Sequence, residues 1–293
     1  MKSIINQLLD DLPEGLIVDA AWLENRQIAS NLRSYYVKQG WLTQPTRGVY
    51  GRLRGRLSWQ HVVISLQTLL QRCFTVGGPM ALSLQGFSSC FSGSALPVHL
   101  YGPEPLPVWL NKLDLQNPFR YRNSEALFCN NPVSFDLFVL VGLFEFFEGR
   151  DLNQLQHSSL TVLPWGPWDW SLVVSKPERA YLELLNEVPT NIIGFEKADQ
   201  VMRVAQHFNP ELLQSLLHNC VNVKVKRLFF FFADRHGHAW RQHLNPDAFN
   251  LGKGKRMLVK GGHFDRCYQI TVPRDFEKKA PVTVVDFEAL ESS

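Results

Sequence analysis

Acidic residues are missing from a long N-terminal part of this 293-residue chain. No Asp or Glu lies between Glu24 and Glu104, whereas eight Lys or Arg residues do, so residues 25–103 sum to +8. The next block, residues 104–200, sums to −6 (seven basic and thirteen acidic residues), and the whole chain sums to only +3. A surface selected for solubility alone mixes both signs of charge. The segregation therefore indicates one module that faces an anion, attached to a body that has different partners.

Cysteines and long apolar runs are also scarce. The five cysteines are an odd number, and no two of them form a Cys-x-x-Cys pair, which excludes a disulfide framework or a zinc ribbon. Reduced thiols in a cytosolic protein are the expected state. No basic segment followed by an apolar run opens the chain, so no secretion signal is expected. The most apolar stretch, residues 137–147, is about half as long as a bilayer span. We expect a soluble, cytoplasmic protein.

Motifs of the common catalytic classes are absent as well. The sequence contains no GxSxG, HExxH or Walker A motif. Glu277-Lys278-Lys279 has the Glu-x-Lys form of a metal-dependent nuclease, with Asp265 upstream. This motif lies in an expected C-terminal tail, where metal ligands would not be held rigidly. We therefore expect neither catalysis nor a cofactor, and a nuclease is the weaker alternative.

What the acid-free segment and its flank contain is the pattern of a helix-turn-helix. Residues 4–9 and 18–23 predict two short helices, the second with Asp19 as its N-cap. A third helix begins near residues 26–28, after a turn of helix-turn-helix length, and ends at Gly40, a residue that tolerates positive φ.

The third helix has two distinct faces. Leu32 and Tyr36 lie four residues apart, with Val37 beside them, which predicts one buried face. A second face carries small polar, amide, aromatic and basic groups at i, i+3, i+4 and i+7. We call it the polar stripe, and it consists of Asn31, Ser34, Tyr35 and Lys38.

The segment after the third helix predicts a wing. Residues 41–43 and 48–50 are able to pair as strands with Arg47 between them, and residues 51–56 alternate Gly or Leu with Arg. A winged helix would place the third helix in the major groove and the wing along phosphates. The alternative is a solvated basic face, against which the absence of acids argues. The candidate DNA-binding residues are Arg26, Asn31, Arg33, Ser34, Tyr35, Lys38, Arg47, Arg52, Arg54 and Arg56.

Within this set, Asn31, Ser34 and Tyr35 are expected to reach bases or sugar edges, and the basic residues from Lys38 onward to hold phosphates. Neutralising Arg52, Arg54 and Arg56 together is expected to weaken binding to all DNA sequences. It should also flatten the salt dependence by up to about three phosphate contacts.

The whole chain predicts an α+β fold with two domains. Residues 1–95 form an N-terminal region with the winged helix-turn-helix at 4–56, and residues 96–293 form a larger mixed α/β domain. The stretch 86–97, rich in Gly, Ser and Pro, marks the boundary. Helical periodicity begins at Ser175, and a short sheet follows the helices. Strand patterns occur at 98–101, 126–128, 133–140, 160–163, 171–174 and 267–272.

Four further motifs have a functional and a structural interpretation. Gly77-Gly78-Pro79 could cradle a phosphate, but no P-loop residues follow it, so a structural turn is favoured. Trp165 to Trp170 could stack bases, but this block is acidic, which again favours a turn. His236, His238 and His243 have no acidic or cysteine partner at a metal-site spacing, so no metal is expected. The glycine-basic loop, residues 252–262, is either a phosphate or RNA site or a solvated turn.

Taken together, these motifs and several short strings resemble the AbiEi antitoxins of bacterial abortive-infection systems, over nearly the whole chain. The strings are Asp19 to Leu23, Gly40 to Leu42, Arg47 to Tyr50, Ser65 to Gln67, Gly77-Gly78, Ala81-Leu82, Gln85-Gly86, Ser175 to Ala180, Lys224 to Phe229, Gly252 to Arg256 and Tyr268 to Pro273.

The resemblance implies a winged-helix repressor that binds inverted repeats in its own promoter. It also implies a C-terminal domain that opposes a nucleotidyltransferase-class toxin by type IV action, without a stable complex. The residues themselves support DNA binding and give no mechanism of toxin neutralisation. The alternative function is a winged-helix transcription regulator that has no toxin partner.

Overall fold

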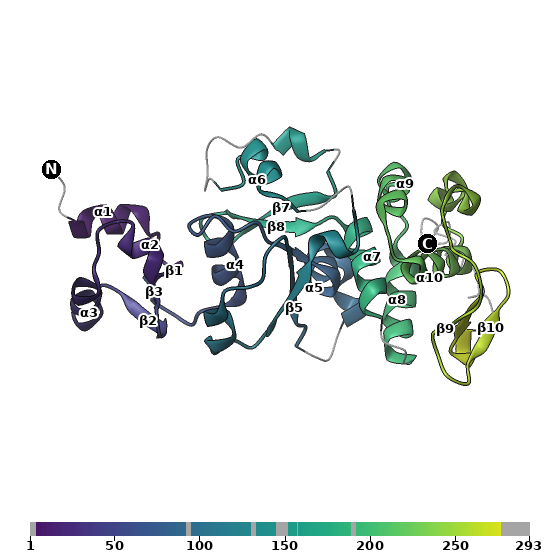
Figure 1. Ribbon diagram of the computed structural model, residues 1–293, viewed down its shortest axis with the longest axis horizontal. Helices are drawn as coiled ribbons and strands as arrows, with labels where there is room; N and C mark the ends of the chain where they lie inside the picture. Colours follow the sequence, from purple (N-terminus) through teal and green to yellow (C-terminus); the bar gives the residue numbers. More distant parts are fainter. Residues whose placement is uncertain are drawn as a thin grey trace, which may run out of the picture. The chain divides into compact units, whose positions relative to one another are not determined.

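Figure 1 shows the computed structural model, whose described part divides into two compact units, 1–183 and 184–293. Both units combine helices with β-strands, which confirms the expected mixed α and β class. No helix in the described part is both long and apolar enough to cross a bilayer. The structure describes residues 4–91, 95–129, 133–144, 152–156, 158–188 and 192–276.

The first unit begins with three helices and a small antiparallel sheet of strand order β1-β3-β2. In this sheet Ile17 pairs with Gly51, and Thr46 pairs with Val49 where β2 turns into β3. The chain order of helix, strand, two helices and two strands is that expected of a winged helix-turn-helix. The elements are α1 (Ile4–Asp11), β1 (Ile17–Asp19), α2 (Ala20–Glu24), α3 (Ser30–Lys38), β2 (Thr43–Thr46) and β3 (Val49–Gly51).

Local hydrogen bonds and backbone angles set the ends of these helices. The Asp19 carboxylate accepts a hydrogen bond from the backbone N–H of Trp22 at 2.9 Å, which confirms the predicted N-cap. Gln27 has a φ of +62° in the turn between α2 and α3. Gly40 follows α3 with a φ of +75°, as expected of a residue that ends a helix.

Strand β1 was not predicted. The sequence assigns Val18 to a helix, but in the structure Val18 pairs with Tyr50 of β3 and the helix begins at Ala20. The reason is tertiary, because β3 supplies hydrogen-bond partners that no local pattern reveals.

A five-stranded sheet of order β6-β5-β4-β8-β7 forms the core of the rest of the first unit. The β4–β8 and β5–β6 pairs are parallel, and the β4–β5 and β7–β8 pairs are antiparallel. The elements are α4 (Trp59–Gln67), β4 (Thr75–Gly77), α5 (Gly78–Leu82), β5 (Val98–Gly102), β6 (Phe119–Asn123), α6 (Phe135–Val141), β7 (Leu160–Trp165), β8 (Trp170–Ser175) and α7 (Pro177–Glu187). The last four residues of α7 belong to the second unit.

This sheet extends across the predicted domain boundary. Strand β4 precedes residue 95, whereas its two neighbours, β5 and β8, follow it. Gln67 of α4 adds a further link, since its side-chain amide donates to the Val173 carbonyl at 3.1 Å and accepts from the Val173 N–H at 3.0 Å. A fragment that starts at residue 96 would therefore lose a central strand, and the first compact unit extends to Glu183.

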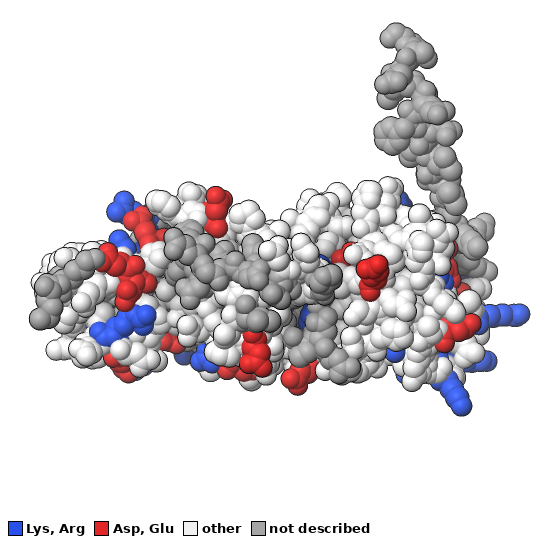
Figure 2. Space-filling view, turned by 90° about the horizontal axis from the view of Figure 1, so that it is seen from above, with Lys and Arg blue, Asp and Glu red and all other residues white. Residues whose placement is uncertain are grey.

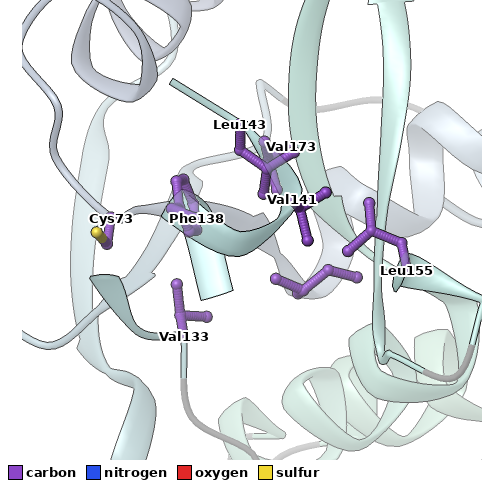
Figure 3. Close-up of a cluster of buried hydrophobic side chains, with 8 residues drawn as sticks. Cys73, Val133, Phe138, Val141, Leu143, Leu155 and Val173 are labelled. Carbon is purple, nitrogen blue, oxygen red and sulfur yellow. The ribbon is translucent and has the colours of Figure 1, made fainter. Parts of the chain in front are cut away.

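Helix α6 corrects the strand predicted at 133–140. The Ser134 hydroxyl accepts from the backbone N–H of Leu137 at 3.3 Å, and Gly142 ends the helix in the left-handed conformation. Phe138 and Val141 of α6 are fully buried in an apolar cluster with Val173 of β8 (Figure 3). The strand predicted at 126–128 is wrong as well, since residues 124–126 form a 3-10 helix, residue 127 lies in a turn and Phe128 forms only an isolated bridge. Periodicity cannot separate a buried strand from a buried helix in a short apolar run.

The Gly77-Gly78 turn connects β4 to α5 by a close approach of backbone and side chain. A Cβ on Gly77 would lie 2.2 Å from a Glu183 oxygen and 2.6 Å from the Tyr101 ring, so only glycine fits. The Gly78 N–H donates to the same Glu183 oxygen at 2.9 Å. The protein's own carboxylate thus occupies the position at which a phosphate would bind, in agreement with a structural turn.

The second unit consists of helices followed by a short sheet of order β10-β11-β9, as the sequence predicts. Asn209 caps α9 through two backbone N–H groups, and Gly237 ends α10 at a φ of +63°. The four phenylalanines of α10 are buried. The elements are α8 (Ile192–Val204), α9 (Pro210–Asn219), α10 (Val223–His236), β9 (Arg256–Met257), β10 (His263–Asp265) and β11 (Ile270–Val272).

A buried charge cluster joins α8 to α10. Asp199 accepts from Arg235 Nε at 2.9 Å and pairs with His236 Nε2 at 2.8 Å, while Arg203 lies 3.6 Å away. Burial alone would raise the pKa of Asp199, but the hydrogen bond from His236 and the surrounding positive charges lower it. The lowered pKa adds stability at neutral pH that is lost as the pH falls below about 4.

Replacing Asp199 by alanine is expected to lower the free energy of unfolding of the second unit by about 3 kcal/mol at pH 7. The loss follows because the guanidinium of Arg235 would be left in a mostly buried position without its carboxylate. Urea unfolding at pH 7 and pH 3 measures the effect. The difference between variant and wild type should shrink at pH 3, and an equal difference at both values would contradict this role.

Candidate nucleic-acid interface

Helix α3 presents its polar stripe to solvent. Asn31, Ser34, Tyr35 and Lys38 are all exposed, whereas Tyr36 on another face of the helix is only 4% exposed. Leu32 and Val37 are half-buried beside Tyr36. The burial pattern agrees with the two faces that the sequence predicts, so the stripe is accessible to a macromolecular partner.

Two side chains of the stripe form local hydrogen bonds that orient them. The Ser34 hydroxyl donates to the Ser30 carbonyl at 3.0 Å, so its oxygen is left to accept from a partner. The Asn31 side-chain oxygen accepts from the backbone N–H of Leu32 at 2.8 Å, so its amide nitrogen is oriented away as a donor.

The wing carries exposed arginines. Arg47 is exposed at the β2–β3 turn, next to Gly48 at a φ of +81°. Arg54 and Arg56 follow β3 and are also exposed. Arg54 pairs with Glu14 at 3.0 Å, but its side chain is 82% exposed, so this surface pair contributes little and can exchange for a phosphate. The wing therefore offers several cations that are able to follow a phosphate backbone.

Arg26 lies outside both the stripe and the wing. Its guanidinium stacks 3.5 Å from the centre of the Trp22 ring, and its Nε pairs with Asp11 at 3.1 Å. The side chain is 38% exposed, so it retains a solvent-facing edge.

Arg33, which is buried, and Arg52, which is half-buried, both donate hydrogen bonds to backbone carbonyls of the protein. Arg33 is 6% exposed, and its Nη1 donates to the Ala20 carbonyl at 3.1 Å and to Glu24 at 2.9 Å. Arg52 Nη1 donates to the carbonyls of Leu9 and Leu12 at 2.7 and 2.9 Å. These hydrogen bonds connect Arg33 to α2 and Arg52 to the C-terminal end of α1, so both guanidinium groups have a structural role.

Replacing Arg33 by leucine is expected to lower the free energy of unfolding by about 2–3 kcal/mol, because buried carbonyls would lose a charged donor. The matched control is Arg47→Leu, which removes the same charge from an exposed position and should change stability by less than about 0.5 kcal/mol. Urea unfolding of both variants measures the difference. Equal stabilities would show that Arg33 has no structural role.

The glycine-basic loop of the second unit surrounds another inward-facing arginine. Arg227, 2% exposed, donates to the carbonyls of Leu251, Gly252 and Gly254 at 2.7, 3.1 and 2.8 Å. Burial and the positive charge of Arg256 lower the pKa of Arg227. Figure 2 shows basic side chains projecting from the surface, and those of this loop, Lys253, Lys255, Arg256 and Lys260, are all exposed. This geometry is compatible with both interpretations of the loop, as a phosphate site and as a solvated turn.

The histidine and tryptophan motifs have structural partners. His236 pairs with Asp199, and His238 Nε2 lies 2.6 Å from the Met202 carbonyl. No group of three or more candidate metal ligands occurs in the described part of the chain. Trp165 pairs with Trp170 across the β7–β8 hairpin, which agrees with the structural turn. The nuclease-like Glu277-Lys278-Lys279 lies outside the described residues.

Sequence reasoning missed one feature of the interface. Trp41, assigned only to a strand, is 44% exposed and contacts Tyr35 edge-on, with ring centroids 6.0 Å apart and an interplanar angle of 89°. The sequence does place a tryptophan directly after the glycine that ends the helix. Its high strand propensity led to its assignment to a strand.

Comparison with known proteins identifies two matching families. Residues 1–92 match the family described as "Transcriptional regulator, AbiEi antitoxin N-terminal domain", and residues 145–273 match "Transcriptional regulator, AbiEi antitoxin, Type IV TA system". No curated protein matches the chain. Among solved structures, the chain is similar to that of the RV2827C protein from Mycobacterium tuberculosis, with 14% identity, a TM-score of 0.49, and coverage of 91% of this chain and 89% of that one.

The two family matches lie in the order that the sequence resemblance implied, and together they cover most of the chain. The first ends close to the predicted boundary at residue 95 and contains all of residues 4–56, where the sequence predicts the winged helix-turn-helix. The chain belongs to the AbiEi family of transcriptional regulators and antitoxins of type IV toxin–antitoxin systems.

Proposed function

We propose that residues 4–56 act as a winged helix-turn-helix that binds double-stranded DNA at inverted repeats in the chain's own promoter and represses transcription. The observation that carries this proposal is the exposure of all four stripe residues on α3, beside a wing with exposed arginines. The family description as a transcriptional regulator supports the same function.

In this proposal α3 enters the major groove. Asn31, with an outward amide donor, and Ser34, with an outward oxygen, reach base edges. Tyr35 lies beside them at the groove surface. The phosphate contacts come from exposed cations on the helix and wing, where counterion release supplies most of the affinity. These cations are Arg26, Lys38, Arg47, Arg54 and Arg56.

The chain also acts, in our proposal, as an antitoxin against a nucleotidyltransferase-class toxin encoded by the adjacent gene, without forming a stable complex with it. The family description as a type IV antitoxin supports this role. DNA binding and toxin neutralisation would then use different parts of one chain.

The test uses full-length protein, because a fragment from residue 96 would lose strand β4. We define the four-site variant as Lys38, Arg47, Arg54 and Arg56 replaced by alanine. This variant is expected to lose promoter repression in a reporter strain while it still rescues growth from the adjacent toxin. If repression persists, the DNA-binding assignment is wrong; if wild-type protein fails to rescue growth, the antitoxin assignment is wrong and a regulator without a toxin partner is favoured.

A further inference from the structure

The polar stripe contains an apolar element that phosphate binding does not explain. Tyr35 is 50% exposed in the middle of the stripe, and Trp41 is 44% exposed just beyond the end of α3. The two rings meet edge-on, with centroids 6.0 Å apart at 89°. We call these two residues the aromatic edge.

The buried Tyr36 ring supports the aromatic edge. Tyr36, 4% exposed, packs under both rings, with centroids 5.4 Å from Trp41 and 6.1 Å from Tyr35. The backbone N–H of Trp41 donates to the Tyr36 carbonyl at 3.0 Å, and Gly40 makes this turn possible at a φ of +75°. The exposed ring surface is therefore fixed relative to Asn31, Ser34 and Lys38 before any partner binds.

An apolar surface of this kind needs an apolar feature in its partner. Phosphates and sugars attract cations and hydrogen-bonding groups, and every base presents a hydrogen-bond donor or acceptor in the major groove. The C5 methyl group of thymine is the apolar feature that the major groove displays. A ring at the centre of a helix that lies in this groove is placed to cover such a methyl group.

We propose that the aromatic edge recognises thymine methyl groups, with Tyr35 as the contacting residue and Trp41 as the residue that positions its ring. This inference rests on the proposed DNA binding and specifies its base preference. It makes Tyr35 a residue that determines specificity, in contrast to Lys38, which carries charge without base information.

The experiment removes the methyl groups and leaves every base pair intact. The DNA immediately upstream of the chain's own gene is amplified once with thymidine triphosphate, which gives thymine DNA, and once with deoxyuridine triphosphate, which gives uracil DNA. Full-length protein is then titrated against each DNA at fixed salt. Wild-type protein should bind the uracil DNA about four-fold more weakly for each contacted methyl. The slope of log affinity against log salt should stay the same, because no phosphate contact changes.

Two substitutions locate the effect. Tyr35→Ala should bind thymine DNA more weakly than wild type does and show no further loss on uracil DNA, whereas Tyr35→Phe, which keeps the ring, should still show the loss. Thermal unfolding checks that both variants remain folded. Equal wild-type binding to the two DNAs, or a loss that persists in Tyr35→Ala, overturns the inference while the proposed DNA binding stands. Absence of specific binding to thymine DNA overturns both.

Discussion

Replacing Arg179 by methionine is expected to lower the free energy of unfolding of the first unit by about 3–5 kcal/mol. Arg179 and Glu183 on α7 both have fully buried side chains, and Arg179 Nε lies 2.8 Å from Glu183 Oε1. The Glu183 carboxylate also accepts from the Ser175 hydroxyl at 3.1 Å and from the Gly78 N–H at 2.9 Å. Methionine would fill the volume but leave a buried carboxylate without its cation.

The pH dependence of this variant has a definite sign. Burial raises the pKa of Glu183, and the charge and hydrogen bonds of Arg179 oppose that rise. Without Arg179 the carboxyl of the folded protein should bind a proton that the unfolded chain releases, so stability falls as the pH rises. The deficit relative to wild type is therefore expected to be smaller at pH 5 than at pH 8.

Denaturant unfolding of full-length protein at both pH values measures these effects. The matched control is Arg72→Met, because Arg72 pairs with Glu104 at 2.7 Å while both side chains are more than 40% exposed. Such a surface pair should contribute about 0–1 kcal/mol. If Arg179→Met is as stable as Arg72→Met, the buried pair does not hold α7 against the β4–α5 turn.

The four-site variant defined above is expected to bind promoter DNA on the order of 100- to 1,000-fold more weakly than wild type at 0.1 M salt. Each phosphate contact contributes about 0.9 to the slope of log affinity against log salt, so the slope should flatten by up to about 3.6. Arg52 is left unchanged, because its substitution would remove hydrogen bonds to α1 in addition to a charge.

A variant with the same change of charge elsewhere serves as control. Lys253, Lys255, Arg256 and Lys260 are exposed on the glycine-basic loop, and their replacement by alanine should leave the salt slope for promoter DNA nearly unchanged. Fluorescence titrations from 50 to about 300 mM salt compare the two variants. An equal loss of affinity in both would mean that net charge governs binding instead of the wing and α3.

The helices of residues 4–56 were predictable from sequence because their signals are local. Asp19 caps a helix, Gly40 ends the next one, and Tyr36 marks the buried face of α3, and each of these features needs only a few neighbouring residues. The helices of the second unit were predictable for the same reason, since Asn209 and Gly237 mark their ends.

Features that depend on distant partners were not predictable. The position of β4 between β5 and β8 joins segments that are far apart in the chain, so this strand order could not be derived from composition. The inward orientation of Arg33 and Arg52 depends on carbonyls of α1 and β1–α2 that no charge pattern reveals. Sequence reasoning can therefore find a basic face, but it cannot tell which of its arginines are structural.

The most direct test of the DNA-binding account is equilibrium binding of full-length protein to the DNA immediately upstream of its own gene, compared with scrambled DNA of the same composition at 0.15 M salt. The account predicts an affinity ratio of about 1,000-fold or more, typical of specific recognition by a helix in the major groove. Equal affinity for the two DNAs would contradict it.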